Sequence, residues 1–471
     1  MNSRLNVIPF NILILLFSII YFIARSTYNL EGMFICGFII LCITIGKYFL
    51  SFDENVAFIL FLFSCFLFMQ GLYLVNILIN GQMNTGFSYE ISQHINDCIL
   101  ISILCLNVGY YLGSKFKFVA GKKKNNKYNT ICMENIQKCS LFLFLLAVLV
   151  NALVIVDVII FVKNYSYLEY YLTYSTHLPR ILQIFGNMYL VFFVIYLATC
   201  PTKKSCKWPT RLFLLMTLLI LISGDRGGVI QNLGLWIVYA LWRQKKDGEV
   251  WIKKRYIVIG FILLPFLLSF LSFFVSIREG IDVGEVTILS QIKRFVSITG
   301  RSAGVIGYGK KYEGLFPQNW YTIGGIIDYI KYNPITCALF GYSKPIPQTR
   351  DYAYTMHAFD SILSYFVYPE SYVRGHGVGS SYVAEAYHDF GYLGVGIINV
   401  LYGIIFKKLN KLNKFNSLNP YKFAIILLII RSLFYAPRGP AAYFITCLLN
   451  ITTITAFIIV DLAAKRNIQI H

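Results

Sequence analysis

A glycine-rich stretch places several side chains that could do chemistry close together. It reads Arg374-Gly375-His376-Gly377-Val378-Gly379-Ser380-Ser381. Ser380 is expected to cap a helix on which Glu385, His388 and Asp389 share one face, because they stand three and four residues apart. A solvated helix face is the alternative, above all for Asp389. Glu385, His376 and His388 are the candidate catalytic residues, since carboxylate and imidazole groups can take a proton from a hydroxyl.

A second candidate site is the turn Gly224-Asp225-Arg226-Gly227-Gly228, which joins two apolar segments. Such a tight turn would hold the Arg226 guanidinium near lipid headgroups, and its glycines would leave backbone N–H groups free where the next helix starts. A helix N-terminus beside an arginine suits an anion. The alternative is a solvated turn in which Arg226 merely reaches the interface beside Asp225.

Other arginines border the apolar segments, where charged groups are costly and often functional. Arg278 directly follows one segment, Arg431 lies inside another, and Arg438 stands at the outer end of that same segment. Arg278 could instead anchor its helix at the interface, and Arg431 could either reach outward or face a polar cavity. With Arg226 and Arg374, these residues form the candidate set for binding a diphosphate.

The sequence lacks several motifs that indicate metal-dependent, serine-esterase or nucleotide-binding chemistry. The outer loops contain no D-x-D pair, no H-E-x-x-H and no G-x-S-x-G, and the chain has no Walker A motif. We therefore expect neither a metal site nor a cofactor. Arginines beside a histidine and a carboxylate suit a diphosphate leaving group and a sugar hydroxyl that gives up its proton.

The elements that must position these residues are apolar segments long enough to cross a hydrocarbon core of roughly 30 Å. We expect twelve membrane-spanning helices, near residues 8–24, 32–50, 56–79, 97–113, 140–162, 181–200, 208–223, 228–242, 256–276, 391–406, 421–436 and 440–460. The first has no A-x-A cleavage site after it, so we expect a retained helix and not a signal peptide.

The basic residues of the connecting loops indicate the orientation. Loops on one side carry 26 lysines and arginines, and the short loops on the other side carry 5. An excess of Lys and Arg marks the cytoplasmic side, so both termini are expected there. The long connection on the outer side has balanced charge. We therefore expect three parts: spans one to nine in 1–276, an outer loop domain in 277–390, and the last spans with a cytoplasmic tail in 391–471.

Composition agrees with an all-α polytopic membrane protein. The chain has 57% hydrophobic and only 14% charged residues, and its mean hydropathy is +0.62. A soluble fold could not bury that much apolar surface. The net charge of +20 is concentrated in the loops expected to be cytoplasmic, so no nucleic-acid partner is needed to explain it. The eleven cysteines lie mostly inside apolar segments and are expected to be core residues.

Three short stretches resemble a known family. They are Gly224-Asp225-Arg226-Gly227, the arginine after the ninth segment, and Gly377-Val378-Gly379-Ser380-Ser381-Tyr382-Val383-Ala384-Glu385 before Phe390-Gly391-Tyr392-Leu393-Gly394. Together they resemble the Wzy-type O-antigen polysaccharide polymerases. The resemblance implies a bacterial inner-membrane glycosyltransferase that joins undecaprenyl-diphosphate-linked repeat units at the periplasmic face. Arg226, Arg278 and Glu385 match the family's motif.

The resemblance implies a mechanism for lipopolysaccharide biosynthesis without a metal. Arg226, Arg278 and either Arg438 or Arg431 would bind the donor diphosphate, and Glu385 or His376 would accept the proton. Expected partners are the lipid-linked oligosaccharides, membrane lipids and a chain-length regulator protein. Two alternatives remain open at this point, an O-antigen ligase and a flippase for the lipid-linked unit.

Overall fold

The computed structural model describes residues 8–115, 130–164, 178–222, 226–253, 293, 296–297, 299–411 and 419–469. Every regular element within these ranges is a helix. The prediction of an all-helical fold is therefore confirmed.

The helices fall into three groups along the chain. The N-terminal group consists of α2 (Ile8–Ser26), α3 (Leu30–Phe49), α4 (Phe52–Cys65), the π-turn η1 (Phe66–Gln70), α5 (Gly71–Asn80), α6 (Tyr89–Lys115), α7 (Thr130–Asn164), α9 (Arg180–Asn187), α10 (Tyr189–Ala198), α11 (Lys203–Ile222) and α12 (Arg226–Asp247). Short helices follow, namely α15 (Ser302–Lys311), η2 (Glu313–Leu315), α16 (Gly324–Lys331), α17 (Pro334–Phe340), α18 (Arg350–Thr355), α19 (Phe359–Val367) and α20 (Pro369–Val373). The C-terminal group is α21 (Tyr382–Lys411), α22 (Pro420–Leu433), the 3-10 turn η4 (Ala436–Arg438), α23 (Tyr443–Leu449) and α24 (Ile451–Gln469).

Many of these helices can cross a membrane. In the described part of the chain, 7 helices are long and apolar enough, or up to 8 if the bent pair α23 and α24 forms one span. The chain is thus a multi-pass membrane protein, as predicted. The expected segments at 208–223, 228–242 and 421–436 coincide largely with α11, α12 and α22, while the one at 256–276 lies outside the described residues. The total of twelve spans stays a prediction.

The outer surface of the bundle shows why it needs lipid around it. On α2, the side chains of Ile12, Leu15 and Phe22 are 60%, 64% and 59% exposed. Large apolar side chains exposed in rows along a helix are unfavourable in water, whereas a hydrocarbon environment solvates them. The same sequence pattern that predicts a span therefore also explains the exposed side chains.

Glycines bring α6 and α21 into backbone contact. A Cβ on Gly109 would lie 2.1 Å from the Val400 carbonyl oxygen, and a Cβ on Gly403 would lie 2.4 Å from the Leu106 carbonyl oxygen. Small residues let membrane helices approach closely enough for dense van der Waals packing. This contact fixes the long arm of α21, and with it the residues at its start.

Helix α21 bends sharply at Phe390 and Gly391, where the backbone leaves the helical region. Gly391 has φ +61 and ψ −154, a conformation that a residue with a Cβ rarely adopts. The bend separates a short arm, which carries Glu385 and Asp389, from the long arm that packs on α6. It falls at the expected boundary between the outer loop domain and residue 391, although the division into three parts stays a prediction.

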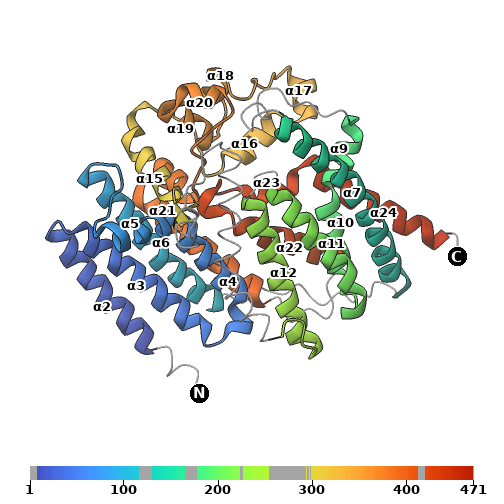
Figure 1. Cartoon of the computed structure of the whole chain (residues 1–471), viewed down its shortest axis with the longest axis horizontal. Helices are drawn as coiled ribbons and strands as arrows, with labels where there is room; N and C mark the ends of the chain where they lie inside the picture. Colours follow the sequence, from blue (N-terminus) through green and yellow to red (C-terminus); the bar gives the residue numbers. More distant parts are fainter. Residues whose placement is uncertain are drawn as a thin grey trace.

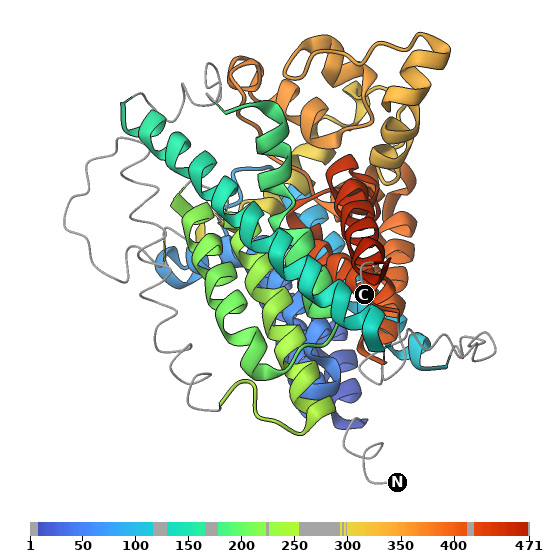
Figure 2. The same cartoon turned by 90° about the vertical axis from the view of Figure 1, so that its right-hand side faces the viewer.

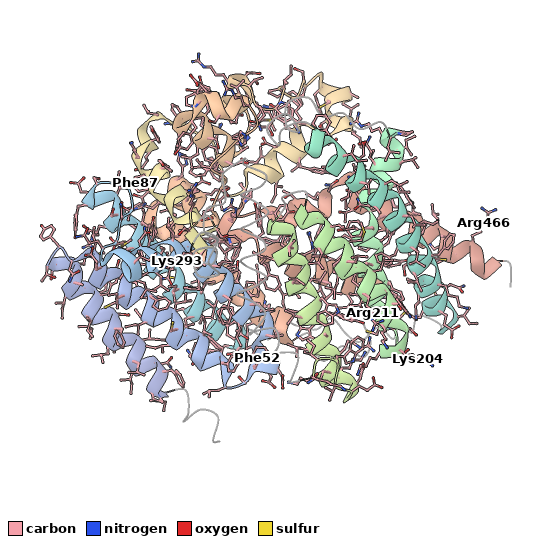
Figure 3. The ribbon with its side chains drawn as sticks, viewed as in Figure 1. Phe52, Phe87, Lys204, Arg211, Lys293 and Arg466 are labelled. Carbon is pink, nitrogen blue, oxygen red and sulfur yellow. The ribbon has the colours of Figure 1, made fainter. Side chains whose placement is uncertain are left out.

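The short helices α16 to α20 gather at one end of the molecule, and helix α2 begins near the opposite end (Figures 1 and 2). Lys204 and Arg211, both in a loop region expected to be cytoplasmic, lie in the half away from these short helices (Figure 3). The described residues thus have one end covered by short helices and another that carries basic side chains.

Candidate functional site

The turn η4 between α22 and α23 presents Arg438. Its guanidinium is half-buried, and Nη1 donates to the Thr299 carbonyl oxygen at 3.5 Å, its one hydrogen bond to a described residue. The backbone just before the turn is held by Ser64, whose hydroxyl donates to the Phe434 carbonyl oxygen at 2.5 Å. The cation is therefore weakly bonded on a turn that is itself fixed, an arrangement that suits an anionic ligand.

The glycine-rich loop lies beside this turn. A Cβ on Gly379 would be 4.0 Å from the Arg438 carbonyl oxygen. Gly375 and Gly379 both have positive φ, at +85 and +80, which explains why glycine is needed at these positions. The Val378 amide donates to the Ser364 hydroxyl at 3.0 Å, so the loop is also tied to α19.

The loop carries two of the predicted site residues. His376 is half-exposed, and its backbone amide donates to the Ser371 carbonyl oxygen at 2.9 Å. Arg374 is exposed at the end of α20. The structure therefore brings His376 and Arg374 onto the loop that borders the Arg438 turn, both within reach of solvent.

Glu385 lies on the short arm of α21 and is only 1% exposed. Its Oε1 accepts from the Ser380 hydroxyl at 2.5 Å, and its Oε2 accepts from the Ala441 amide at 2.8 Å. Ser380 was expected to cap the helix, but its hydroxyl binds this carboxylate instead. Glu385 thus links the glycine-rich loop to the chain that follows Arg438.

His388 and Asp389 face a different part of the molecule. The Asp389 carboxylate accepts from the Tyr321 and Thr322 amides at 3.1 and 2.7 Å, and His388 Nδ1 lies 3.2 Å from its Oδ1. The His388 ring packs against the rings of Phe316, Tyr321 and Phe359. In the described residues no hydrogen bond joins His388 to the Glu385 carboxylate. These contacts support a structural role for His388, and its catalytic role stays untested.

The Asp389 contacts lead to a prediction about stability. Asp389→Ala should lower the free energy of unfolding by about 3 kcal/mol, because two backbone amides lose a charged acceptor that is almost fully buried. Thermal unfolding of the purified protein in detergent measures this change. Asp351→Ala is the matched control, because Asp351 is exposed and accepts from Thr355 within its own helix. Equal melting temperatures for the two variants would contradict the assignment.

Arg431 points into the bundle and binds a neighbouring helix. Its Nε donates to Asn232 Oδ1 at 2.7 Å, and Asn232 on α12 is 1% exposed. Asn232 in turn donates to the Thr217 hydroxyl at 3.2 Å. Of the two alternatives, this contact favours the polar interior over the membrane interface. It ties α22 to α12, and the predicted binding of a diphosphate by Arg431 stays untested.

The side chains of two predicted arginines lie outside what the structure describes. Arg226 is the first residue of α12, so a helix does begin at the expected turn, but the description covers only its backbone. Arg278 lies outside the described residues. Their roles in binding a diphosphate stay predictions.

The structure adds Asp360 to the candidate site, although spacing along the chain did not indicate it. Asp360 at the start of α19 is accessible to water, yet the dense protein around its carboxyl desolvates it and raises its pKa. Its carboxyl lies near enough to interact electrostatically with Glu385. Its backbone carbonyl accepts from the Ser364 hydroxyl, which also binds the glycine-rich loop. The one sequence signal for Asp360 is an acidic residue in the first turn of a helix, which is common at helix starts.

Comparison with known proteins identifies the family. A family model described as O-antigen polysaccharide polymerase Wzy matches residues 7–468. No curated protein and no solved structure matches the chain. The family match includes the Arg438 turn, the glycine-rich loop and the short arm of α21. The chain therefore belongs to the O-antigen polysaccharide polymerase Wzy family.

Proposed function

We propose that the chain transfers a growing polysaccharide from its undecaprenyl-diphosphate carrier onto the sugar of a new lipid-linked repeat unit. Family membership supports an O-antigen polymerase role, and the proposal adds the lipid carrier and the chemistry. The observation that carries it is Arg438 on its fixed turn, whose guanidinium has one long hydrogen bond to the part of the chain that the structure describes. A diphosphate leaving group needs such a cation as charge builds up on its oxygens.

The proposed reaction balances as a simple substitution at the anomeric carbon. The hydroxyl oxygen of the acceptor sugar forms a bond to this carbon, and the bond between the carbon and the diphosphate oxygen breaks. Arg438 binds the diphosphate as it leaves with both electrons of that bond. His376 accepts the hydroxyl proton, because it is half-exposed on the loop beside the Arg438 turn. Arg226, Arg278 and Arg374 belong to the same proposed cationic site.

The proposal also includes an orientation. The end with the short helices would face the periplasm, and both termini would lie in the cytoplasm of a bacterial inner membrane. The basic residues Lys204 and Arg211 support this, since they lie away from the short helices (Figure 3), and Lys and Arg prefer the cytoplasmic side. A chain-length regulator protein as a partner stays a prediction of the sequence.

A deletion strain tests the function. Loss of a polymerase should leave lipopolysaccharide with a core and one repeat unit, because ligation and flipping continue without chain growth. Gel separation of the lipopolysaccharide distinguishes the possibilities. A core without any repeat unit would contradict the proposal and favour a ligase or a flippase.

Purified protein tests the chemistry. Proteoliposomes given undecaprenyl-diphosphate-linked repeat units should build longer chains, and should do so in excess EDTA, because the proposed site uses guanidinium groups to bind the diphosphate. Chain length on a gel is the measurement. Activity that EDTA abolishes and magnesium restores would contradict the metal-independent mechanism while leaving the polymerase role intact.

A further inference from the structure

Glu385 has unusual surroundings for a group that takes a proton from a substrate. A general base must come within hydrogen-bonding distance of the proton that it removes. Glu385 is 1% exposed, and each of its carboxylate oxygens already accepts from a protein donor, the Ser380 hydroxyl at 2.5 Å and the Ala441 amide at 2.8 Å. A sugar hydroxyl therefore has no access to the carboxylate in this structure.

The same helix binds both backbone polar groups of Ala441. Glu385 binds the amide, and the Tyr402 hydroxyl donates to the Ala441 carbonyl oxygen at 2.6 Å. Tyr402 is 1% exposed, and its ring stacks on that of Tyr382, with centroids 4.9 Å apart. Two hydrogen bonds from the two arms of α21 thus hold Ala441, one at its backbone amide and one at its backbone carbonyl.

Ala441, the residue that these bonds hold, lies three residues after Arg438. Before the turn, Ser64 binds the Phe434 carbonyl oxygen at 2.5 Å. Within the turn, the Arg438 amide donates to the Tyr435 carbonyl oxygen at 2.9 Å. The chain that carries the guanidinium is thus anchored on both sides, and the Glu385 side chain supplies the anchor on the C-terminal side.

We infer that Glu385 is a positioning residue, which fixes the turn bearing Arg438 by binding the Ala441 amide, and that it does not accept the substrate proton. This inference rests on the proposed function for the part that concerns catalysis. It explains why a carboxylate is buried between two chain segments that lie far apart in the sequence. Positioning matters because a displacement of about 1 Å at a reacting group can lower the rate about 100-fold.

Two substitutions separate positioning from proton transfer. Glu385→Gln keeps both links, since the amide oxygen can accept from Ala441 and the amide nitrogen can donate to Ser380. Polymerisation by this variant should stay within about tenfold of the unaltered protein, because the hydrogen bonds to Ala441 and Ser380 are both retained. Glu385→Ala breaks both links, and its rate should fall about 100-fold. Glu370→Ala, at an exposed position on α20, is the control and should keep its rate.

Hydrogen exchange at the Ala441 amide tests whether Glu385 and Tyr402 hold this residue, and it does not depend on activity. The Ala441 amide should exchange at least about tenfold faster in Glu385→Ala than in the unaltered protein, and should stay protected in Glu385→Gln. Tyr402→Phe is a second variant in case Glu385→Ala does not fold. It retains the stacked ring and removes the hydrogen bond to the Ala441 carbonyl. The Ala441 amide should therefore exchange faster than in the unaltered protein, but by a smaller factor than in Glu385→Ala.

The outcomes are distinct. An inactive Glu385→Gln with a protected Ala441 amide would overturn the inference and make Glu385 the proton acceptor. An unchanged exchange rate of the Ala441 amide in both Glu385→Ala and Tyr402→Phe would show that these two side chains do not hold Ala441 in place. If the unaltered protein builds no chains, the proposed function fails, whereas the exchange rates still decide whether Glu385 holds the turn.

Discussion

Arg438→Lys should stop chain growth and leave lipopolysaccharide with a core and a single repeat unit. A guanidinium can bind two diphosphate oxygens at once through its planar set of donors, and an ammonium group at the same position cannot. Removing such stabilisation of developing charge typically lowers the rate about 100- to 1,000-fold. The measurement is the banding pattern on a gel at matched protein levels, followed by initial rates in proteoliposomes.

The control for this substitution is Arg350→Lys. Arg350 is exposed on α18, where its guanidinium lies over the Tyr354 ring, away from the turn that carries Arg438. This variant should make long chains at the normal rate. Long chains from Arg438→Lys would remove Arg438 from the diphosphate site. The remaining predicted members would be Arg226, Arg278, Arg374 and Arg431.

His376→Gln should lower kcat by about 100- to 10,000-fold, the usual contribution of a general base. Glutamine can still form hydrogen bonds from this loop, but it does not accept a proton in the working pH range. The Michaelis constant for the donor should change little, because Arg438 and the loop backbone remain in place. Initial rates with purified variants in proteoliposomes measure both quantities.

Asp360→Asn is the matched comparison for His376→Gln. The carboxyl of Asp360 is accessible, and the backbone carbonyl of this residue connects through Ser364 to the same loop. We expect Asp360→Asn to retain most of its activity. If Asp360→Asn loses kcat and His376→Gln does not, the proton acceptor is Asp360.

Local backbone conformation and side-chain contacts differ in how far they can be predicted along the chain. Residues 374 to 381 were predicted to form a functional loop, and the positive φ angles of Gly375 and Gly379 explain the glycines there. The shared helix face of Glu385, His388 and Asp389 does not indicate which groups these side chains contact. Side chains three and four residues apart are neighbours on a helix, but Glu385 binds Ala441 and Asp389 binds Tyr321 and Thr322.

The all-helical membrane fold and the family follow from the amino-acid sequence alone. Apolar segments of membrane-spanning length must form helices, because lipid offers no hydrogen-bond partner to the backbone. A helix satisfies its backbone groups locally, so hydropathy along the chain is enough to predict it. The family match over residues 7–468 depends on sequence in the same way.

The contacts of each charged side chain, in contrast, depend on how the helices pack in three dimensions. Ala441 lies 56 residues from Glu385, and Asn232 lies 199 residues from Arg431. Such contacts depend on how helices pack and where α21 bends at Gly391, and helix periodicity carries no information about either. Burial of a carboxylate is favourable only with suitable donors, and for Glu385 those donors are brought together by folding alone.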